Sequence, residues 1–512
     1  MDKSRSQPHP SDYARNQFMF SRSDFHFEDD NGFCADGEVW TPKDPGIANK
    51  VKAPIVFIHT DHHDRTIWYD KPDQNPGWAE VFVSMGFTVY LIDLPHRATP
   101  DATPDMEAFA DVYGNIQELP LKVVKDFFTA CRQVNNPEWP EAKLHTQWPD
   151  NGDAEDKSPH IDVYTKRYIA KLRPECVDHA ERQAASQQSI QLLLRHIGKP
   201  TTLLGHGSGA IYAMLAADLV PELVKCIIAV EPIGPPFGTC QYLSKDGETI
   251  EIGSMTRVKI RRPYGISDIP LTFDPPAICP QSFISLLDYD SCEEDLTSPL
   301  EVEKTWNQEE SNWFFWQARS PGKPIRKLIN LAKVPLVVLT GEASYHRRID
   351  WATVAFLRQA GVKTDHIKLE KVGFKGNGHL CFLEKNSLEI ARFIADGIPD
   401  VVLPAPAPSY PIPPIQHPGT GDIFQPSRQL QAIRTSSTGR INNENQDPRG
   451  LSRDQLTTNG SSSNHQGFER PVKAKGVNSR PEGLEEPVKT KSVDFNPSGL
   501  EGPVETKSVF DF

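Results

Sequence analysis

The sequence lacks several features that mark membrane, disulfide-bonded and nucleic-acid-binding proteins. No apolar run reaches the ~18 residues of a membrane span, and residues 1–20 lack the apolar segment of a signal peptide. The eight cysteines form no CxxC pair, which indicates reduced thiols and no cysteine-based metal site. A net charge of -13 disfavours nucleic acid as the main partner. We therefore expect a cytoplasmic protein with no membrane span, metal or other cofactor.

The composition also predicts which parts of the chain fold. Hydrophobic residues make up 38% of the sequence and there are 45 prolines, which indicates a folded core diluted by unstructured segments. After about residue 400 the chain is rich in proline and small polar residues, and units such as GLEEPVKTKSV recur with a period of 16 residues. We predict a flexible N-terminus (1–19), one folded domain (20–400) and a disordered tail (401–512).

Short apolar runs alternate with helical patterns through the predicted domain. After a first sheet region at 20–42, the strands are expected at 53–60, 86–95, 199–207, 224–232, 334–342 and 364–372. The helices are expected at 77–86, 209–221, 351–361 and 382–397. This alternation predicts an α/β protein, with a mostly parallel central sheet and helices on both faces.

Two long insertions interrupt the alternation, at about 96–180 and 232–330. Insertions after sheet strands usually lie over the crevice at the carboxyl edge of the sheet. The second insertion contains the aromatic run NWFFWQ. We expect it to form a lid over a substrate pocket; decorative surface segments are the alternative.

The stretch LLGHGSGAIYAM, at 203–214, predicts a sharp turn between a strand and a helix. Such a turn can present a nucleophilic side chain and point the helix N-terminus at a developing oxyanion. It requires small residues two before and two after its centre, which Gly205 and Gly209 provide around Gly207. Gly207 is therefore expected at the nucleophile's position, with Ser208 in the first helical turn. Ser208 is a candidate nucleophile or a simple helix cap.

A histidine and an acid are expected on loops that follow strands. His379 lies in the glycine-rich loop GNGH after the last strand, directly before the helix predicted at 382–397. Glu231 and Glu342 each follow a strand, and the order of nucleophile, acid and histidine holds for either. The residue pattern leaves both acids open.

The loop HTDHHD after the first buried strand would supply oxyanion donors, from His59 and Thr60. Such a loop is usually glycine-rich because the backbone must approach the substrate closely. Asp61 is expected to oppose an oxyanion. A metal site is an alternative for this loop, because histidine and aspartate are common ligands, but a polar loop is favoured.

The chain resembles α/β-hydrolase-fold proteins of the bacterial esterase 713-like group and their fungal relatives. The resemblance covers about residues 20–398 and rests on PIVFIH, PGWAEVFVSMGFTVYLIDLPHRA, LHTQWP, LLGHGSGAIYAM, AVEPIGPPFG and GNGHLCFLEKNS. It implies the α/β-hydrolase fold, Glu231 as the acid and His379 as the catalytic histidine. The group's IY pair aligns with Ile211 and Tyr212, which puts Gly207 where its serine stands.

Two further segments depart from that group. Its HGGG-like oxyanion segment corresponds to HTDH here, at 59–62, and its PGRG turn corresponds to PHRA, at 95–98. Three features that depend on glycine or on the nucleophile are therefore altered together.

Three functions are compatible with the sequence. The first is hydrolysis of a carboxylic ester or related small acyl substrate, by Ser208 with His379 and Glu231, or by a water that this pair activates. The second is non-catalytic binding of a small apolar molecule on a hydrolase scaffold. The third is cofactor-free lyase or isomerase chemistry by the His379–Glu231 pair. The sequence carries no indication of substrate identity or oligomeric state.

Overall fold

The computed structural model describes residues 20–30, 32–43, 52–95, 116–117, 119–129, 132, 139–149, 163–176, 178–241, 254–258, 261–277 and 299–397. The predicted flexible N-terminus, the predicted disordered tail with its repeats, and most of the PHRA segment lie outside these residues. Among the described helices, none combines the length and the apolar character needed to cross a bilayer.

An eight-stranded sheet forms the centre of the domain, in the order β1-β2-β4-β3-β7-β8-β15-β16. The strands are β1 (Phe20–Glu28), β2 (Cys34–Pro42), β3 (Ile55–Ile58), β4 (Val89–Asp93), β7 (Thr201–His206), β8 (Val224–Val230), β15 (Leu336–Thr340) and β16 (Thr364–Lys368). The hairpin β1–β2 is antiparallel and β2 pairs antiparallel with β4. Every other pairing in this sheet is parallel. This is the α/β-hydrolase fold that the sequence predicted.

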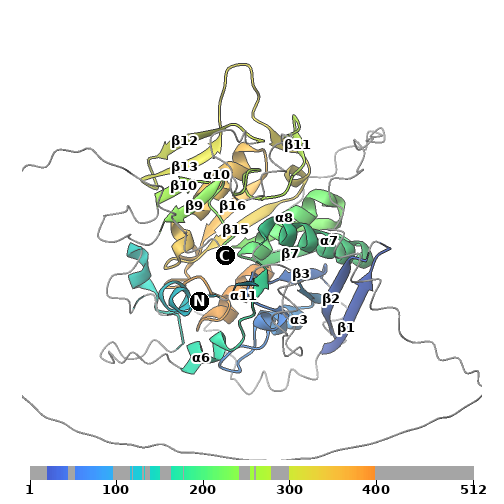
Figure 1. The fold of residues 1–512 in the computed structure, drawn as a ribbon. Helices are drawn as coiled ribbons and strands as arrows, with labels where there is room; N and C mark the ends of the chain where they lie inside the picture. The colour runs from blue at the N-terminus through green and yellow to red at the C-terminus, as the bar shows by residue number, and fades with distance from the viewer. Residues whose placement is uncertain are drawn as a thin grey trace, which may run out of the picture. The chain divides into compact units, whose positions relative to one another are not determined.

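Helices cover both faces of the sheet. They are α3 (Trp78–Ser84), α7 (His179–Ile197), α8 (Ser208–Leu219), α10 (Asp350–Gln359) and α11 (Ser387–Gly397). Figure 1 shows α7 and α8 on one side of β3 and β7, and α3 and α11 on the other. Helix α7 begins at the N-cap Asp178, whose side chain accepts the Glu181 N–H, and ends at Gly198 in the left-handed conformation.

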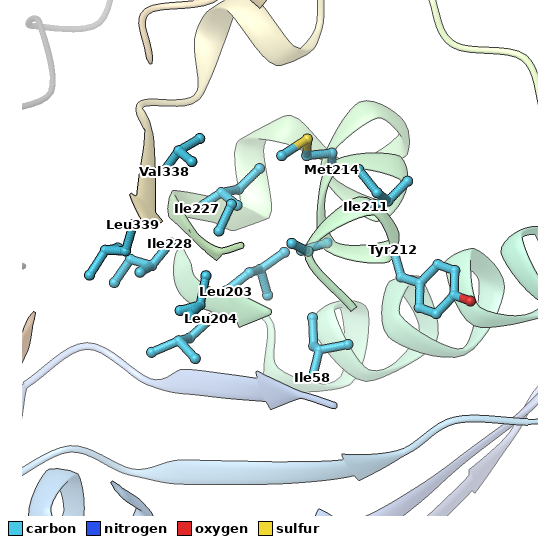
Figure 2. Packing of buried hydrophobic residues seen from close by; sticks show 14 of the residues in the cluster. Ile58, Leu203, Leu204, Ile211, Tyr212, Met214, Ile227, Ile228, Val338 and Leu339 are labelled. Carbon is cyan, nitrogen blue, oxygen red and sulfur yellow. The ribbon is translucent and has the colours of Figure 1, made fainter. Parts of the chain in front are cut away.

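The core lies where α8 packs on the central strands. Figure 2 shows side chains of β7, β8 and β15 meeting those of α8, among them Leu203, Ile227, Val338 and Met214. All residues of β3 and β7 are buried, as expected for strands covered on both faces. The turn between β7 and α8 is therefore held between two rigid elements.

The first insertion contributes short elements, and its aromatic side chains reach the core. The elements are β5 (Ile116–Gln117), α5 (Leu121–Val123), the π-helical η3 (Val124–Thr129), η5 (Pro140–Leu144), α6 (Val163–Ile169) and β6 (Glu175–Cys176). Phe127 stacks on Trp139, and both contact Tyr345.

The described part of the second insertion contains three small two-stranded antiparallel sheets. They pair β9 (Gly238–Gln241) with β10 (Ser254–Arg257), β11 (Phe273–Asp274) with β14 (Lys327–Leu328), and β12 (Val302–Asn307) with β13 (Asn312–Gln317). Figure 1 shows β12 and β13 beside α10. The run NWFFWQ is β13, and its Phe314 packs on Trp351 of α10.

Two sequence expectations need correction. The helix expected at 382–397 begins only at Ser387, because Glu384 accepts hydrogen bonds from the preceding loop and holds that segment in turns. The chain expected as strand through 372 leaves β16 at Lys368 and continues as the short helix η11 (Leu369–Val372).

Candidate active site

The turn at Gly207 has the geometry that its small neighbours require. Gly207 has φ 56° and ψ -121°, a backbone conformation that L side chains rarely adopt. A Cβ atom on Gly205 would lie 2.4 Å from the Gly209 carbonyl oxygen, and one on Gly209 would lie 2.4 Å from the His59 carbonyl oxygen. Both flanking positions therefore exclude any side chain.

Thr60 fills the space beside Gly207. A Cβ atom built on Gly207 would lie 2.3 Å from Thr60 Oγ1 and 2.9 Å from Thr60 Cβ. Thr60 follows β3 directly, so its hydroxyl reaches the turn from the neighbouring strand. The side chain that the turn lacks is thus replaced in space by one from the β3 loop.

The hydroxyl of Ser208 forms hydrogen bonds with the same loop. Its Oγ accepts the Asp61 N–H at 3.0 Å and lies 3.1 Å from Thr60 Oγ1. The Ser208 N–H donates to Thr60 Oγ1 at 3.1 Å. The expectation that this hydroxyl caps α8 is wrong, because helix position N1 directs it across to the β3 loop. Between the described residues Ser208 and His379 there is no hydrogen bond.

Glu231 and His379 meet as a buried pair. His379 Nδ1 lies 2.7 Å from Glu231 Oε2, and the two side chains are 6% and 1% exposed. The Gly341 N–H and the Ser344 hydroxyl also donate to this carboxylate, at 2.8 and 2.7 Å. With Nδ1 donating to the carboxylate, Nε2 is the basic nitrogen. Glu231 has φ 48°, a strained value for a residue with a side chain.

The other candidate acid, Glu342, lies apart from the histidine nitrogen. Its Oε2 accepts the Gly376 N–H at 2.8 Å and so stabilises the loop that carries His379. The geometry thus distinguishes two acids that the residue pattern left open.

Burial sets the protonation of the pair. It holds the pKa of His379 well below its usual value, with His206, His346 and His63 acting in the same direction. Burial raises the pKa of Glu231, and the charge of Asp350 adds to it, whereas the hydrogen bonds from Gly341 and Ser344 favour the carboxylate. A neutral imidazole at neutral pH is the state that can accept a proton.

The β3 loop is polar, and the rings of His59 and His63 are held by hydrogen bonds within the protein. His63 bonds the Asp61 carbonyl through Nδ1 and the Tyr168 hydroxyl through Nε2, at 2.8 and 2.9 Å. His59 bonds the Thr60 carbonyl and accepts the Leu94 N–H, so its ring orders the loop.

The Asp61 carboxylate, which is expected to oppose an oxyanion, has two side-chain partners. It is paired with Arg182 at 3.1 Å and accepts the Tyr212 hydroxyl at 2.8 Å. The charge is therefore neutralised beneath the loop, and the Asp61 N–H faces Ser208 instead.

In the described residues, His206, Glu231 and His379 are the buried group whose ligand atoms lie within 4.8 Å of one another. A cation there would break the hydrogen bond between Glu231 and His379. These residues therefore fit a hydrogen-bonded acid–histidine pair better than a metal site.

A cavity of about 80 Å³ opens at these residues. Thr60, Gly207, Ser208 and His379 line it, together with apolar side chains from the insertions and the α10 region; these are Leu119, Val123, Phe128, Ile233 and Ile349. None of the aromatic residues of β13 reaches it. The second insertion lines the cavity with other residues, among them Ile233, Thr239 and Arg262. The aromatic rings that contact His379 are Phe128 of the first insertion and Tyr345.

The sequence analysis missed three residues of this site. His206, at the end of β7, bonds the His379 carbonyl at 3.1 Å, and Ser344 holds Glu231. His346 stacks against His379. His206 directly precedes the glycine of the turn, and Ser344 lies in the loop that follows β15. Neither position has a sequence pattern that would distinguish the residue from the other histidines and serines of the chain.

The fold and the buried Glu–His pair beside the β7–α8 turn define an α/β-hydrolase-fold protein. The chain is 30% identical to the "Probable secreted lipase phiG" of Fungal sp. (strain ATCC 74256), over 67% of this chain and 80% of that protein. The chain belongs to the family of that protein. Its location in the cell stays a prediction, because "secreted" describes the relative.

Solved structures with similar folds share little sequence. A novel bacterial esterase is 16% identical with a TM-score of 0.39, covering 74% of this chain and 95% of the other. The dienelactone hydrolase of Anabaena variabilis is 11% identical with a TM-score of 0.32, covering 74% and 96%. No family model matches the chain.

Proposed function

We propose that this protein hydrolyses a carboxylic ester or related small acyl substrate, with His379 as general base and Glu231 as the residue that orients it. The observation that carries the proposal is the hydrogen bond of 2.7 Å between these two side chains, at the wall of an apolar-lined cavity. A 30% identical relative that is named a lipase supports the same class of reaction. Membership of the esterase 713-like group is part of this proposal.

The nucleophile in the proposal is a water molecule. Gly207 stands at the turn where the resemblance puts a serine, and it has no hydroxyl. Ser208 has its hydroxyl engaged by the Asp61 N–H and Thr60. A water bound in the cavity can instead lose its proton to His379 Nε2 while its oxygen adds to the acyl carbon.

Thr60 is the proposed donor to the substrate's carbonyl oxygen. Its oxygen accepts the Ser208 N–H, which polarises the Thr60 O–H bond, and Thr60 lines the cavity. The backbone N–H groups that would stabilise an oxyanion directly are occupied by the hydroxyls of Thr60 and Ser208. The Thr60 hydroxyl would pass this stabilisation on to the substrate.

The test compares four proteins on a panel of short-chain esters: wild type, His379→Ala, Glu231→Gln and Ser208→Ala. Loss of the general base is expected to lower kcat at least about 100-fold. Ser208→Ala is expected to keep kcat within about tenfold, because it removes no reacting atom. If kcat falls as far in Ser208→Ala as in His379→Ala, Ser208 is the nucleophile. Turnover unaffected by His379→Ala would refute the proposal.

A further inference from the structure

A second histidine–carboxylate pair lies directly beside the first. His346 Nδ1 lies 2.8 Å from Asp350 Oδ1, and both side chains are buried. The rings of His346 and His379 are stacked, with 5.0 Å between centroids and 7° between planes. Both histidines line the same cavity. Both direct Nδ1 to a carboxylate, which leaves each Nε2 as the nitrogen available for proton transfer.

One residue joins the two pairs. The Ser344 hydroxyl donates to the Glu231 carboxylate at 2.7 Å, and the same hydroxyl oxygen accepts the backbone N–H of His346 at 3.1 Å. Ser344 is the N-cap of the short helix η10 (Tyr345–Arg348), which carries His346. Asp350 is fixed in turn by the Thr340 hydroxyl at 2.6 Å. The second pair is therefore positioned as firmly as the first.

We propose that His346 is a second catalytic residue, which acts as general acid and protonates the leaving group. This inference rests on the proposed hydrolysis at His379. Water transfers a proton to His379 Nε2 as its oxygen bonds to the acyl carbon. The C–O bond to the leaving group then breaks, and the departing oxygen takes the proton from His346 Nε2. The products are a carboxylic acid and an alcohol, and solvent returns one proton from His379 to His346.

The surrounding charges favour this division of roles. His346 Nδ1 lies 2.8 Å from the Asp350 carboxylate on α10, while His379, Glu231 after β8 and His206 at the end of β7 face the same region. Two protonated rings 5.0 Å apart repel each other. A reaction in which one ring gains a proton as the other loses one avoids the doubly charged state.

The test exploits the leaving group. Para-nitrophenolate departs without a proton, whereas an alkoxide needs one, so a missing general acid matters only for alkyl esters. The variant His346→Asn keeps an amide nitrogen near Asp350 but loses Nε2. His26→Asn is the matched control, because His26 forms an exposed histidine–carboxylate pair with Asp36, at 2.6 Å, and does not line the cavity.

The expected result is a kcat about 100-fold or more lower for an alkyl ester in His346→Asn, with a change of less than about fivefold for the p-nitrophenyl ester. His26→Asn keeps both rates. Equal losses on the two esters, or none, would overturn the role of His346 while leaving hydrolysis intact. Wild type inactive on both esters would instead refute the proposed function.

Discussion

A side chain at position 207 would collide with Thr60, so a serine cannot simply be placed at this turn. In Gly207→Ser the new Cβ would lie 2.3 Å from Thr60 Oγ1, so the β3 loop must shift. We expect a loss of about 1–3 kcal/mol in the free energy of unfolding.

The double variant Gly207→Ser with Thr60→Gly should recover much of that stability, because glycine removes both clashing atoms. It should also gain labelling by a fluorophosphonate serine probe, since the new hydroxyl lies at the turn beside His379. Denaturant unfolding and mass spectrometry measure the two effects. A double variant no more stable than Gly207→Ser would contradict the steric account.

The Thr60 hydroxyl is the proposed oxyanion donor, so its removal should affect turnover more than binding. Thr60→Val keeps the shape of the side chain, and its kcat is expected to fall about 100- to 1,000-fold, the usual effect of losing one such donor. Thr60→Ser keeps the hydroxyl and should retain most of the rate. Steady-state kinetics decide the matter; similar losses in both variants would argue for a packing role.

At the scale of elements, the loop after β16 depends on one buried carboxylate. Glu384 accepts the Gly378 N–H at 2.8 Å, the Asn377 amide at 2.7 Å and His145 Nε2 at 2.7 Å. These bonds tie the two residues before His379 to Glu384, which follows it, and delay the start of α11. The sequence could not predict this, because Glu384 satisfies a helical pattern and its partners are far away or in irregular chain.

Removal of that carboxylate should disorder the histidine loop. Glu384→Ala is expected to cost about 3–5 kcal/mol of stability, since it leaves buried donors unpaired. We also expect kcat to fall in the fraction that remains folded. Glu310→Ala, which breaks the ion pair with Lys368, is the control and should change little. Unchanged kcat in folded Glu384→Ala would show that the loop is positioned by other contacts.

The order of strands and helices could be predicted because each parallel strand is a short apolar run bounded by loop residues. The two acids after β8 and β15 could not be separated by this pattern, since both follow strands of the same sheet. Which acid pairs with the histidine depends on how the loop that carries His379 folds back. In the structure this loop brings His379 Nδ1 to Glu231 and not to Glu342. The aromatic composition of the β13 run predicts a lid over the pocket. In the structure β13 pairs with β12, and its Phe314 packs on Trp351 of α10.

At the scale of the whole molecule, buried histidines should make stability depend on pH. Burial lowers the pKa of His63 and of His366 to about 4. Histidine in the unfolded chain has a pKa near 6.5. Between about pH 6.5 and pH 4, the unfolded chain therefore binds more protons than the folded one. The contribution of each of these histidines to stability is therefore complete above about pH 6.5. It is lost as the pH falls towards 4, by about 1.4 kcal/mol per pH unit.

Denaturant unfolding between pH 7 and pH 4.5 measures this slope. In His366→Gln the slope should be smaller by about 1.4 kcal/mol per pH unit, because one group no longer titrates. A slope identical to that of wild type would mean that His366 titrates alike in the folded and unfolded chains.

The most direct test of hydrolysis by the His379–Glu231 pair without a protein nucleophile is a single-turnover reaction on an ester, quenched in acid and analysed by intact-protein mass spectrometry. The account predicts full product formation with no acyl group on the protein at any time, and no product in His379→Ala. An acyl adduct that forms and decays at the rate of turnover, on Ser208 or Thr60, would contradict it.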